Sequence, residues 1–464
     1  MNNKNINKKI KRVGFVYLSL ASSAVKRRAF EEKFMLRPRL GLEYLCAALK
    51  KRGIGSRIYD QVLGDFSPEL LANLLEKDSV DLAGFYIVSK NLAVAKSFIS
   101  KLKEKAAIPL IAGGPGSRHY SELIASGCEM VCLGEGDIVI TDIVDFYEGR
   151  KSVNEINGIA YNDAEDGKVA LTAERPLIEE LDRLPFPLRD PKAIKKYCDY
   201  FAYPLKQPYI SVLASRGCLH NCAFCTSHSF WKGKYRQRSP ENVIEEIRQA
   251  VSELRIRSVQ FIDDIFAVNM NWLTEFCQAI KREKFSLNWM CTLHPLTFGK
   301  DRDRAFLMMK ECGCNIVSFG AQSADCGILK RINRDPREIE ELKKAVRKAK
   351  SSGMTTCLNY IFGLPGETAE TIKKDFTFCL EVKPHILDMH PLEIIPFSKL
   401  SEYKEEDICL MDKKELARVS AGYMVNYYIR PQVAFQLLSD IVRKNPRRIY
   451  TFGKMAFYCL RNLS

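Results

Sequence analysis

Three cysteines lie close together in a stretch that follows a predicted strand. The stretch reads Ser-Arg-Gly-Cys-Leu-His-Asn-Cys-Ala-Phe-Cys over residues 215–225, so Cys218, Cys222 and Cys225 have the spacing C-x3-C-x2-C. Cysteine thiolates are strong ligands for zinc and for iron–sulfur clusters. Because the three residues share one loop, their sulfur atoms can converge on one metal centre.

The number of cysteines separates these two metal chemistries. A structural zinc site is closed by four ligands, and no fourth cysteine lies near this loop. His220 or His228 could complete a zinc site, so the spacing alone leaves zinc open. A 4Fe–4S cluster held by three cysteines keeps one iron free to bind a substrate or cofactor. The missing fourth cysteine therefore favours the iron–sulfur cluster.

The loop resembles the cluster-binding loop of radical S-adenosylmethionine (radical SAM) enzymes. Those enzymes share this spacing and an aromatic residue before the last cysteine, here Phe224. The resemblance implies a 4Fe–4S cluster on the three cysteines, S-adenosylmethionine (SAM) bound to its open iron, and Phe224 as a SAM contact. It also implies an electron donor such as flavodoxin or ferredoxin and a 5′-deoxyadenosyl radical that abstracts hydrogen from the substrate. In such enzymes the cofactor performs the hard chemistry, and the protein orients and shields it.

The candidate catalytic residues follow predicted strands. Phe-Ile-Asp-Asp-Ile-Phe over 261–266 places Asp263 and Asp264 at a strand end, where they could bind the methionine ammonium or act on substrate. Asp263 is therefore also a candidate SAM contact. Asp264 fits equally well as the cap of a following helix. His390 opens His-Pro-Leu-Glu over 390–393 and could line a substrate cavity, although a core histidine fits at least as well.

Two further motifs resemble SAM-binding segments of the same family. Ser-Phe-Gly-Ala-Gln-Ser over 318–323 lies where many relatives carry Gly-x-Glu-Ser, which makes Gln322 and Ser323 candidate SAM contacts. Gln322 replaces the glutamate, so an acceptor is kept and the charge is lost. Ile-Phe-Gly-Leu-Pro-Gly-Glu over 361–367 resembles the fifth-strand glycine motif, and the resemblance implies that the backbone at Gly363 approaches adenine.

These motifs fall on a regular alternation of strands and helices. Short apolar segments predict six strands, at 210–214, 258–263, 287–293, 316–319, 356–362 and 386–392. Amphipathic segments such as 242–254 and 337–352 predict helices between them. Six β/α units predict a partial, TIM-like (β/α)6 barrel with its chemistry at the carboxyl ends of the strands.

The N-terminal half shows a second alternation. Apolar segments predict strands at 13–18, 56–60, 82–87, 109–112 and 130–133, with helices between them. Short buried strands separated by helices predict an α/β fold with a Rossmann-like, doubly wound parallel sheet. The ligand of such a sheet lies beyond the carboxyl ends of its strands.

This half resembles the cobalamin-binding domain fused to many radical SAM enzymes. Pro-Arg-Leu-Gly-Leu-Glu-Tyr-Leu over 38–45, Ala-Gly-Gly-Pro-Gly over 112–116 and Gly-Glu-Gly over 134–136 match that subclass in kind and order. The chain has no Asp-x-His-x-x-Gly motif, so no histidine ligand to cobalt of the mutase type is expected. The resemblance implies cobalamin (B12) as a cofactor, with contacts from the glycines of the two turns, Gly113, Gly114, Gly134 and Gly136.

The predicted domains follow from these patterns. Six of the 19 prolines fall between residues 176 and 208, too many for a helix or a central strand. A hairpin is expected around 163–167. The sequence therefore predicts a cobalamin-binding-type domain over 1–149, an ordered proline-rich linker over 150–208, a radical SAM barrel over 209–400 and a helical, basic region over 401–464.

Positive charge is concentrated at the two ends of the sequence. The net charge is +15, of which residues 1–40 contribute +9 and residues 430–464 contribute +6. A nucleic-acid enzyme usually carries a basic stripe across its body, so no nucleic-acid partner is expected. The stretch 443–463 mixes basic and aromatic residues. It fits either docking on the protein or an interfacial surface that gives peripheral membrane contact and serves a lipid-like substrate.

Composition restricts the class of protein. The 464 residues are 46% hydrophobic and 27% charged, which is typical of a globular protein with two or three domains. No apolar run approaches the roughly 20 residues of a membrane span. The 16 cysteines are mostly scattered through apolar segments, as reduced core residues are, so a cytoplasmic protein is expected.

The favoured function is cobalamin-dependent C-methylation of an unactivated carbon in a small or lipid-like metabolite. The alternative is a cobalamin-independent radical SAM dehydration, epimerisation, cyclisation or rearrangement, because fold analogy alone does not choose among them. A methylthiotransferase is disfavoured, since Leu-Ser-Leu-Ala-Ser-Ser over 18–23 lacks the cysteine that a second cluster needs. A non-catalytic zinc or cobalamin carrier would not cleave SAM, and zinc without iron and sulfide would favour it.

Overall fold

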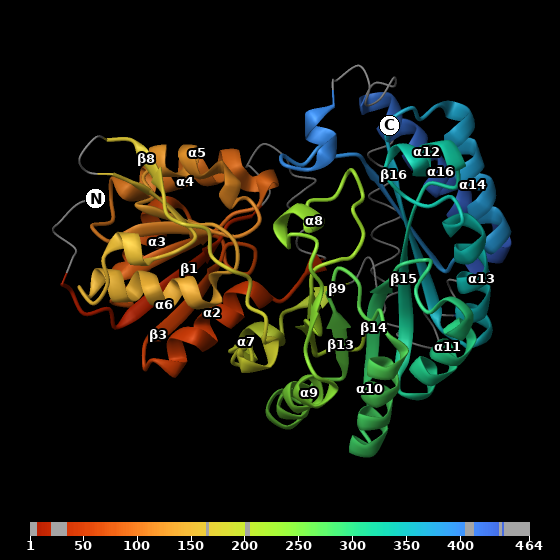
Figure 1. Cartoon of the computed structure of the whole chain (residues 1–464), viewed down its shortest axis with the longest axis horizontal. Helices are drawn as coiled ribbons and strands as arrows, with labels where there is room; N and C mark the ends of the chain where they lie inside the picture. Colours follow the sequence, from red (N-terminus) through yellow and green to blue (C-terminus); the bar gives the residue numbers. More distant parts are fainter. Residues whose placement is uncertain are drawn as a thin grey trace. The chain divides into compact units, whose positions relative to one another are not determined.

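The computed structural model describes most of the chain. The described residues are 7–19, 35–163, 167–199, 205–403, 413–435 and 439. The chain divides into two compact units, Met1–Tyr197 and Cys198–Ser464, and each is described by itself (Figure 1). The basic stretch 443–463 lies outside the described residues. In the part of the chain that the structure describes, no helix is long and apolar enough to cross a membrane.

The first unit is built on a seven-stranded sheet with the order β3-β1-β4-β5-β6-β7-β8. The first five strands in this order are parallel, and β7 and β8 are antiparallel. The parallel part confirms the predicted Rossmann-like sheet, in the 2-1-3-4-5 order of flavodoxin-like folds. The bounds are β1 Arg12–Tyr17, β3 Gly55–Asp60, β4 Leu82–Tyr86, β5 Leu110–Gly113, β6 Met130–Cys132, β7 Ile159–Asn162 and β8 Val169–Leu171.

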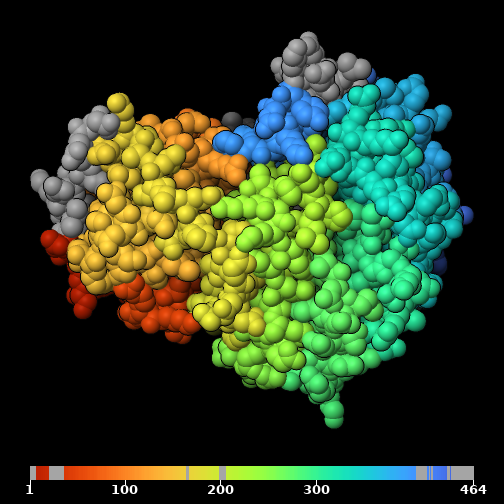
Figure 2. Space-filling view, viewed as in Figure 1, coloured from red at the N-terminus to blue at the C-terminus, as the bar shows by residue number. Residues whose placement is uncertain are grey.

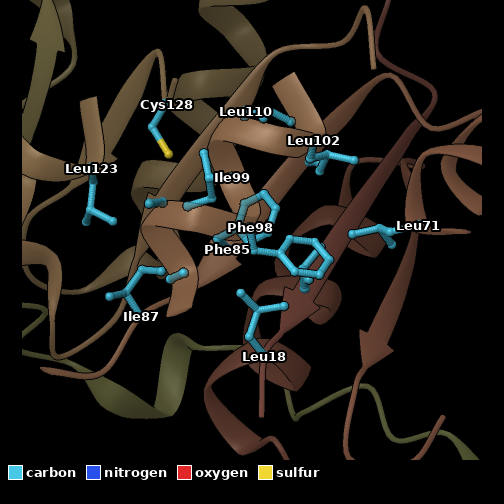
Figure 3. Packing of buried hydrophobic residues seen from close by; sticks show 14 of the residues in the cluster. Leu18, Leu71, Phe85, Ile87, Phe98, Ile99, Leu102, Leu110, Leu123 and Cys128 are labelled. Atoms are coloured by element: carbon cyan, nitrogen blue, oxygen red, sulfur yellow. The ribbon is translucent and has the colours of Figure 1, made fainter. Parts of the chain in front are cut away.

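Helices cover both faces of this sheet (Figure 1). Helices α3, α4 and α5 contribute to the hydrophobic core on one face, and α2 and α6 to the core on the other. Figure 3 shows the first core, where Phe98 and Ile99 of α4 lie near Phe85 and Leu110 of the sheet. The helix bounds are α2 Leu40–Lys51, α3 Pro68–Lys77, α4 Leu92–Lys103, α5 Tyr120–Ala125, α6 Gly136–Tyr147 and α7 Pro191–Ile194.

The proline-rich segment is bonded to the first unit. Its predicted hairpin is present as β7 and β8, and β7 extends the sheet beyond β6. Further along, the N–H of Ile178 donates to Glu135 Oε2 at 2.8 Å, and the N–H of Leu188 donates to Glu43 O at 3.0 Å. The first compact unit, which ends at Tyr197, therefore includes most of the segment expected to act as a linker.

The second unit is built on a six-stranded parallel sheet with the order β10-β13-β14-β15-β16-β17. Strands β10 and β17 form its two edges, as expected of a partial (β/α)6 barrel. Each strand overlaps a predicted one. The bounds are β10 Tyr209–Val212, β13 Ser258–Phe261, β14 Asn288–Leu293, β15 Cys314–Gln322, β16 Thr355–Phe362 and β17 Ile386–Pro391.

Helices follow the strands of this sheet, and Figure 2 shows α9, α10 and α11 at the surface on the side viewed. Trp289 of β14 is fully buried and packs against Phe261 and Phe276, with ring centroids 5.7 Å apart in both pairs. This aromatic contact anchors α10 to the sheet. The helix bounds are α8 Ser227–Phe230, α9 Pro240–Leu254, α10 Met270–Glu283, α11 Arg302–Glu311, α12 Cys326–Arg331, α13 Glu338–Ser351, α14 Ala369–Val382 and α16 Lys413–Tyr428.

Helix α16 packs along the edge strand β17. Tyr428 Oη accepts a hydrogen bond from the N–H of Leu387 at 2.8 Å and donates one to the carbonyl of the same residue at 3.1 Å. The neighbouring Tyr427 donates to Pro384 O at 2.5 Å. The hydroxyls of α16 therefore satisfy backbone groups at one edge of the sheet.

Candidate active site

The three-cysteine loop begins just beyond the end of β10. A short antiparallel ladder pairs β11, Ser215–Arg216, with β12, Arg236–Gln237, and closes the loop at its base. Gly217 has a φ of +103°, and a Cβ on it would lie 2.0 Å from Lys234 O. Only glycine allows the backbone at 217 to approach the backbone at 234 so closely.

The middle of the loop is anchored through Ala223. Its N–H donates to Ile332 O at 2.9 Å, and its carbonyl accepts from the N–H of Leu400 at 3.0 Å. Its side chain is buried in an apolar cluster that includes Leu364. Phe224, the predicted SAM contact, packs partly buried against the same cluster. The loop is thereby fixed to the barrel next to Cys222.

The three cysteines are free and half-buried. The N–H of His220 donates to Cys218 Sγ and the N–H of Ser227 to Cys225 Sγ, both at 3.4 Å. Burial raises the pKa of Cys218 to about 12 and that of Cys222 to about 11. Because metals bind thiolates, ligation at these sites releases protons.

The donor set fits a cluster better than a single ion. In the described part of the chain, no group of three His, Cys, Asp or Glu side chains could hold one metal ion. His220 instead stacks on His294, with ring centroids 3.6 Å apart, and the ring of His228 lies against Gly233. A 4Fe–4S cluster needs no convergence on one ion, because each thiolate binds a different iron. The residues present therefore fit a cluster on the three cysteines.

The paired aspartates bond to the two ends of this loop. Asp263 is buried and its Oδ1 accepts from Ser215 Oγ at 2.5 Å. Burial raises the pKa of Asp263 to about 7. Asp264 Oδ2 accepts from Ser227 Oγ at 2.8 Å, just after the last cysteine. The next helix, α10, is capped by Asn269, so the interpretation of Asp264 as a helix cap is wrong.

The Ser-Phe-Gly-Ala-Gln-Ser motif over 318–323 contains a β-bulge at the end of β15. The register between β15 and β16 shifts between Gly320 and Gln322, and Gln322 has a φ of +64°. Its Oε1 is buried and has no hydrogen-bond partner among the described residues. Ser323 Oγ donates to Asp375 Oδ1 of α14 at 2.9 Å. Gln322 thus offers an acceptor for a ligand, whereas the hydroxyl of Ser323 is held by the helix.

The glycine motif after β16 is closed by its own glutamate. Gly363 has a φ of +88°, and its N–H donates to Glu367 Oε2. Glu367 is fully buried, and burial raises the pKa of its carboxyl to about 8. Helix α14 begins beyond it and is capped by Thr368. The side chain of Glu367 therefore holds the turn in which Gly363 lies.

His390 lies in a row of polar residues on the inner face of the barrel. Phe319 packs outward on α11, so the alternation of β15 turns Ser318 inward. Asn359 Nδ2 donates to Ser318 Oγ at 2.8 Å, and Asn359 pairs in register with Asp388. His390 is exposed, with its Nε2 2.9 Å from Asp388 Oδ1. Sequence analysis identified only His390 of this row, although strand alternation could have found the others.

The glycine turn after β5 packs against the loop after β4. The carbonyl of Gly113 accepts from the N–H of Ile87 at 2.8 Å. Gly114 has a φ of +100°, and a Cβ on it would lie 2.8 Å from Ile87 O. A Cβ on Gly116 would lie 2.9 Å from the backbone of Val88. These glycines allow two strand-end loops to approach each other.

The second glycine turn has more space. Gly134 has a φ of +102°, and no atom of another described segment lies within 4 Å of the position of its Cβ. Gly136 begins α6 and lies close to Leu45, 3.2 Å from the position of its Cβ. Glu135 is buried between them. Only one of the four predicted glycines, Gly134, therefore borders open space on its side-chain side.

An aromatic stack lies where the order of the first sheet reverses. Tyr17 ends β1 and Tyr86 ends β4, and their rings stack with centroids 5.8 Å apart. The guanidinium carbon of Arg39 lies 3.5 Å from the centroid of the Tyr17 ring, and Arg39 Nε donates to Asp60 Oδ2 at 2.8 Å. Ligands of such sheets bind at this reversal. Sequence analysis missed the stack because its members come from separate elements.

Comparisons with known proteins agree with this geometry. Residues 212–379 match the family model for the radical SAM superfamily. An uncharacterised methyltransferase of Pyrococcus horikoshii is 26% identical over 427 residues, which cover 87% of this chain and 90% of that protein. The anaerobic magnesium-protoporphyrin IX monomethyl ester cyclase of Rubrivivax gelatinosus is 25% identical over 422 residues, covering 89% of this chain and 74% of the cyclase.

A solved structure has the same fold over most of the chain. The radical SAM methyltransferase TsrM of Kitasatospora setae, solved with cobalamin and a [4Fe–4S] cluster, superposes with a TM-score of 0.69 at 15% identity. The match covers 84% of this chain and 74% of TsrM. Residues 212–379 of the chain are a radical SAM domain. The chain is an enzyme that uses a 4Fe–4S cluster and SAM.

Proposed function

We propose that the chain is a radical SAM C-methyltransferase that binds cobalamin in its first unit. Its substrate is a small or lipid-like metabolite with an unactivated carbon, and a protein such as flavodoxin or ferredoxin supplies electrons. The observation that carries the proposal is that one chain combines the three-cysteine barrel with a flavodoxin-like sheet in which Gly134 borders open space. The fold shared with TsrM supports this combination.

The first unit would bind cobalamin at the carboxyl ends of β1, β4, β5 and β6. Gly134 allows the backbone to approach a flat ligand, because no side chain of the described residues occupies the space beside it. Gly113 and Gly114 keep the neighbouring loops close together, and Gly136 begins α6 beside them. When bound, cobalamin supplies a methyl group that can be transferred to carbon.

The second unit would bind the cluster and SAM at the carboxyl ends of its strands. The cluster supplies the electron for reductive cleavage of SAM. Cys218, Cys222 and Cys225 would hold the cluster. Gln322 Oε1, which has no hydrogen-bond partner in the described part of the chain, would accept a hydrogen bond from SAM. Gly363, held by Glu367, presents backbone to the adenine in this proposal.

The roles of the other candidates follow from their contacts. Asp263 and Asp264 hold the cysteine loop at its two ends. The exposed His390 and the half-buried Asp388 form a polar pair on β17 and would face the substrate. Ser323 would support the SAM-binding segment through its bond to Asp375.

A second candidate function is radical ring formation without methyl transfer. It is favoured by the similarity to the cyclase of Rubrivivax gelatinosus, which extends over 89% of this chain. This alternative uses the same cysteine loop and SAM-binding segments. It makes no use of a methyl group from cobalamin.

Anaerobic reconstitution distinguishes the two functions. The protein is incubated with iron, sulfide and hydroxocobalamin and desalted, and all three components are quantified. SAM and a strong reductant are then added, and 5′-deoxyadenosine is measured. We expect a cluster, SAM cleavage and one cobalamin per chain. A cluster that cleaves SAM in a protein that retains no cobalamin would overturn the methyltransferase proposal.

A further inference from the structure

A short segment after α12 runs along the middle of the cysteine loop. Ile332 O accepts from the N–H of Ala223 at 2.9 Å, and Asn333 Nδ2 donates to Asn221 O at 2.7 Å. The next residue, Arg334, is buried. The loop is therefore bonded at two of its residues to a segment more than 100 positions further along the chain.

A pair of stacked histidines adds a contact to the same part of the loop. His220 lies between the first two cysteines, and its ring stacks on that of His294, just beyond β14. The ring centroids are 3.6 Å apart and the planes differ by 14°. His294 Nε2 lies 3.2 Å from Arg334 Nη2 and 3.4 Å from Glu338 Oε1.

Hydrogen bonds fix the orientation of the His294 ring. Its Nδ1 accepts from the N–H of Leu296 at 3.3 Å. These bonds assign the ring proton to Nε2, which donates it to Glu338. Glu338 also pairs with Arg334, and the side chains of both are almost fully buried. Rotation of the His294 ring would therefore break hydrogen bonds on both of its sides and remove one of the partners of the buried Glu338.

We propose that His294 is a positioning residue for the iron–sulfur cluster. Its ring, held by Glu338 and Leu296, forms a flat support for His220 and so sets the path of the loop between Cys218 and Cys222. The inference rests on the assignment of the cluster to the three cysteines in the proposed function. It is independent of whether cobalamin binds.

The test compares three variants of the reconstituted full chain. His294→Ala removes the ring, and His294→Phe keeps a flat ring but loses both nitrogen contacts. His385→Ala is the matched control, because His385 Nδ1 also accepts a backbone N–H, from Thr356 at 3.1 Å, at the opposite end of the strands. The rate at which a chelator removes iron is followed by absorbance under anaerobic conditions. Electron paramagnetic resonance spectra of the reduced cluster are recorded with and without SAM.

We expect His294→Ala to speed cluster loss about tenfold. The variant removes the ring that stacks on His220 together with the hydrogen bonds that hold this ring in place. His294→Phe should recover part of this effect, and the control should stay within about twofold of the wild type. The spectrum of the reduced cluster should change in His294→Ala and not in the control. An unchanged loss rate and spectrum in folded His294→Ala would overturn the proposal.

A double-mutant cycle keeps the test decisive if one variant folds poorly. His220→Ala removes the other ring and should have the same effect as His294→Ala, and the double variant should be no worse than either. Effects that multiply in the double variant would contradict action through the stack. Cobalamin is quantified in the same samples, so its absence would count against the methyltransferase proposal alone. Failure of the wild type to assemble a cluster would count against the cluster assignment.

Discussion

Ser215 donates a hydrogen bond of 2.5 Å to Asp263, which joins the first residue of the loop ladder to the segment that follows the second barrel strand, β13. Both residues are buried. Asp264 makes the corresponding bond to Ser227 on the other side of the cysteines. Two adjacent carboxyl groups therefore fix both ends of the loop that we propose as the cluster-binding loop.

Removal of these two carboxylates should have unequal effects. Asp263→Ala removes this buried bond and leaves the Ser215 hydroxyl with only its longer bond to Ile265 O at 3.2 Å, which costs about 1–3 kcal/mol. We expect several-fold less iron bound per chain in this variant. Asp264→Ala breaks an exposed bond and should cost less than about 1 kcal/mol. Thermal unfolding and iron content after desalting measure both effects. If the two variants lost equal stability and equal iron, burial of the Ser215–Asp263 bond would have no consequence.

Loss of one cluster ligand should abolish SAM cleavage. Cys222→Ala removes one of three thiolates, so we expect the iron and sulfide content to collapse and 5′-deoxyadenosine to be undetectable. Cys326→Ala is the control, because Cys326 is exposed at the start of α12 and lies outside the loop. The control should retain the wild-type metal content. An intact cluster in Cys222→Ala would refute the assignment of the ligands.

We expect a side chain at position 134 to reduce cobalamin retention by more than backbone strain alone would. Gly134→Ala adds a methyl group to the open space at the end of β6, and we expect cobalamin retention to fall about tenfold or more. Gly167→Ala is the matched control, since Gly167 also has a positive φ, +67°, and no atom of another described segment within 4 Å of its Cβ position. The register of β6 and β7 puts its hairpin turn at the other end of the sheet. Equal cobalamin retention in the two variants would argue against a cobalamin site beside Gly134.

The buried Glu367 should make stability depend on pH. Burial raises its pKa in the folded protein from an ordinary value of 4.5 to about 8. The protonated form is favoured by folding, so its contribution to stability is complete below the unfolded pKa and is lost as the pH rises through 8. Asp375, whose pKa burial raises to about 7, contributes with the same sign.

Glu367→Gln should remove part of this dependence. We expect the melting temperature of the variant, relative to that of the wild type, to increase between pH 6 and 9. Glu370→Gln is the control: Glu370 is exposed and its pKa is lowered by backbone hydrogen bonding, so it stays ionised throughout this range. A constant difference between Glu367→Gln and the wild type would exclude titration of Glu367 in the folded protein.

Strand positions were predictable because they depend on local patterns. The apolar run predicted at 356–362 is observed as β16 from Thr355 to Phe362. The spacing of the cysteines likewise predicted a 4Fe–4S cofactor, because it is a local pattern too. Contacts between distant segments were not predictable, since His294 and Glu338 are 44 positions apart and neither lies in a recognisable motif. The inward-facing Asn359 and Asp388 fall between these cases, because strand alternation indicates them once the register is known.

The bonds from Tyr428 to both backbone groups of Leu387 have a consequence for association of the protein with itself. An edge strand with free N–H and C=O groups is a template for pairing with a strand of another molecule. The phenol occupies two of the backbone groups of β17 that such pairing would use. Tyr428→Phe removes this protection without removing the ring, and it should increase concentration-dependent aggregation while the active site stays unchanged.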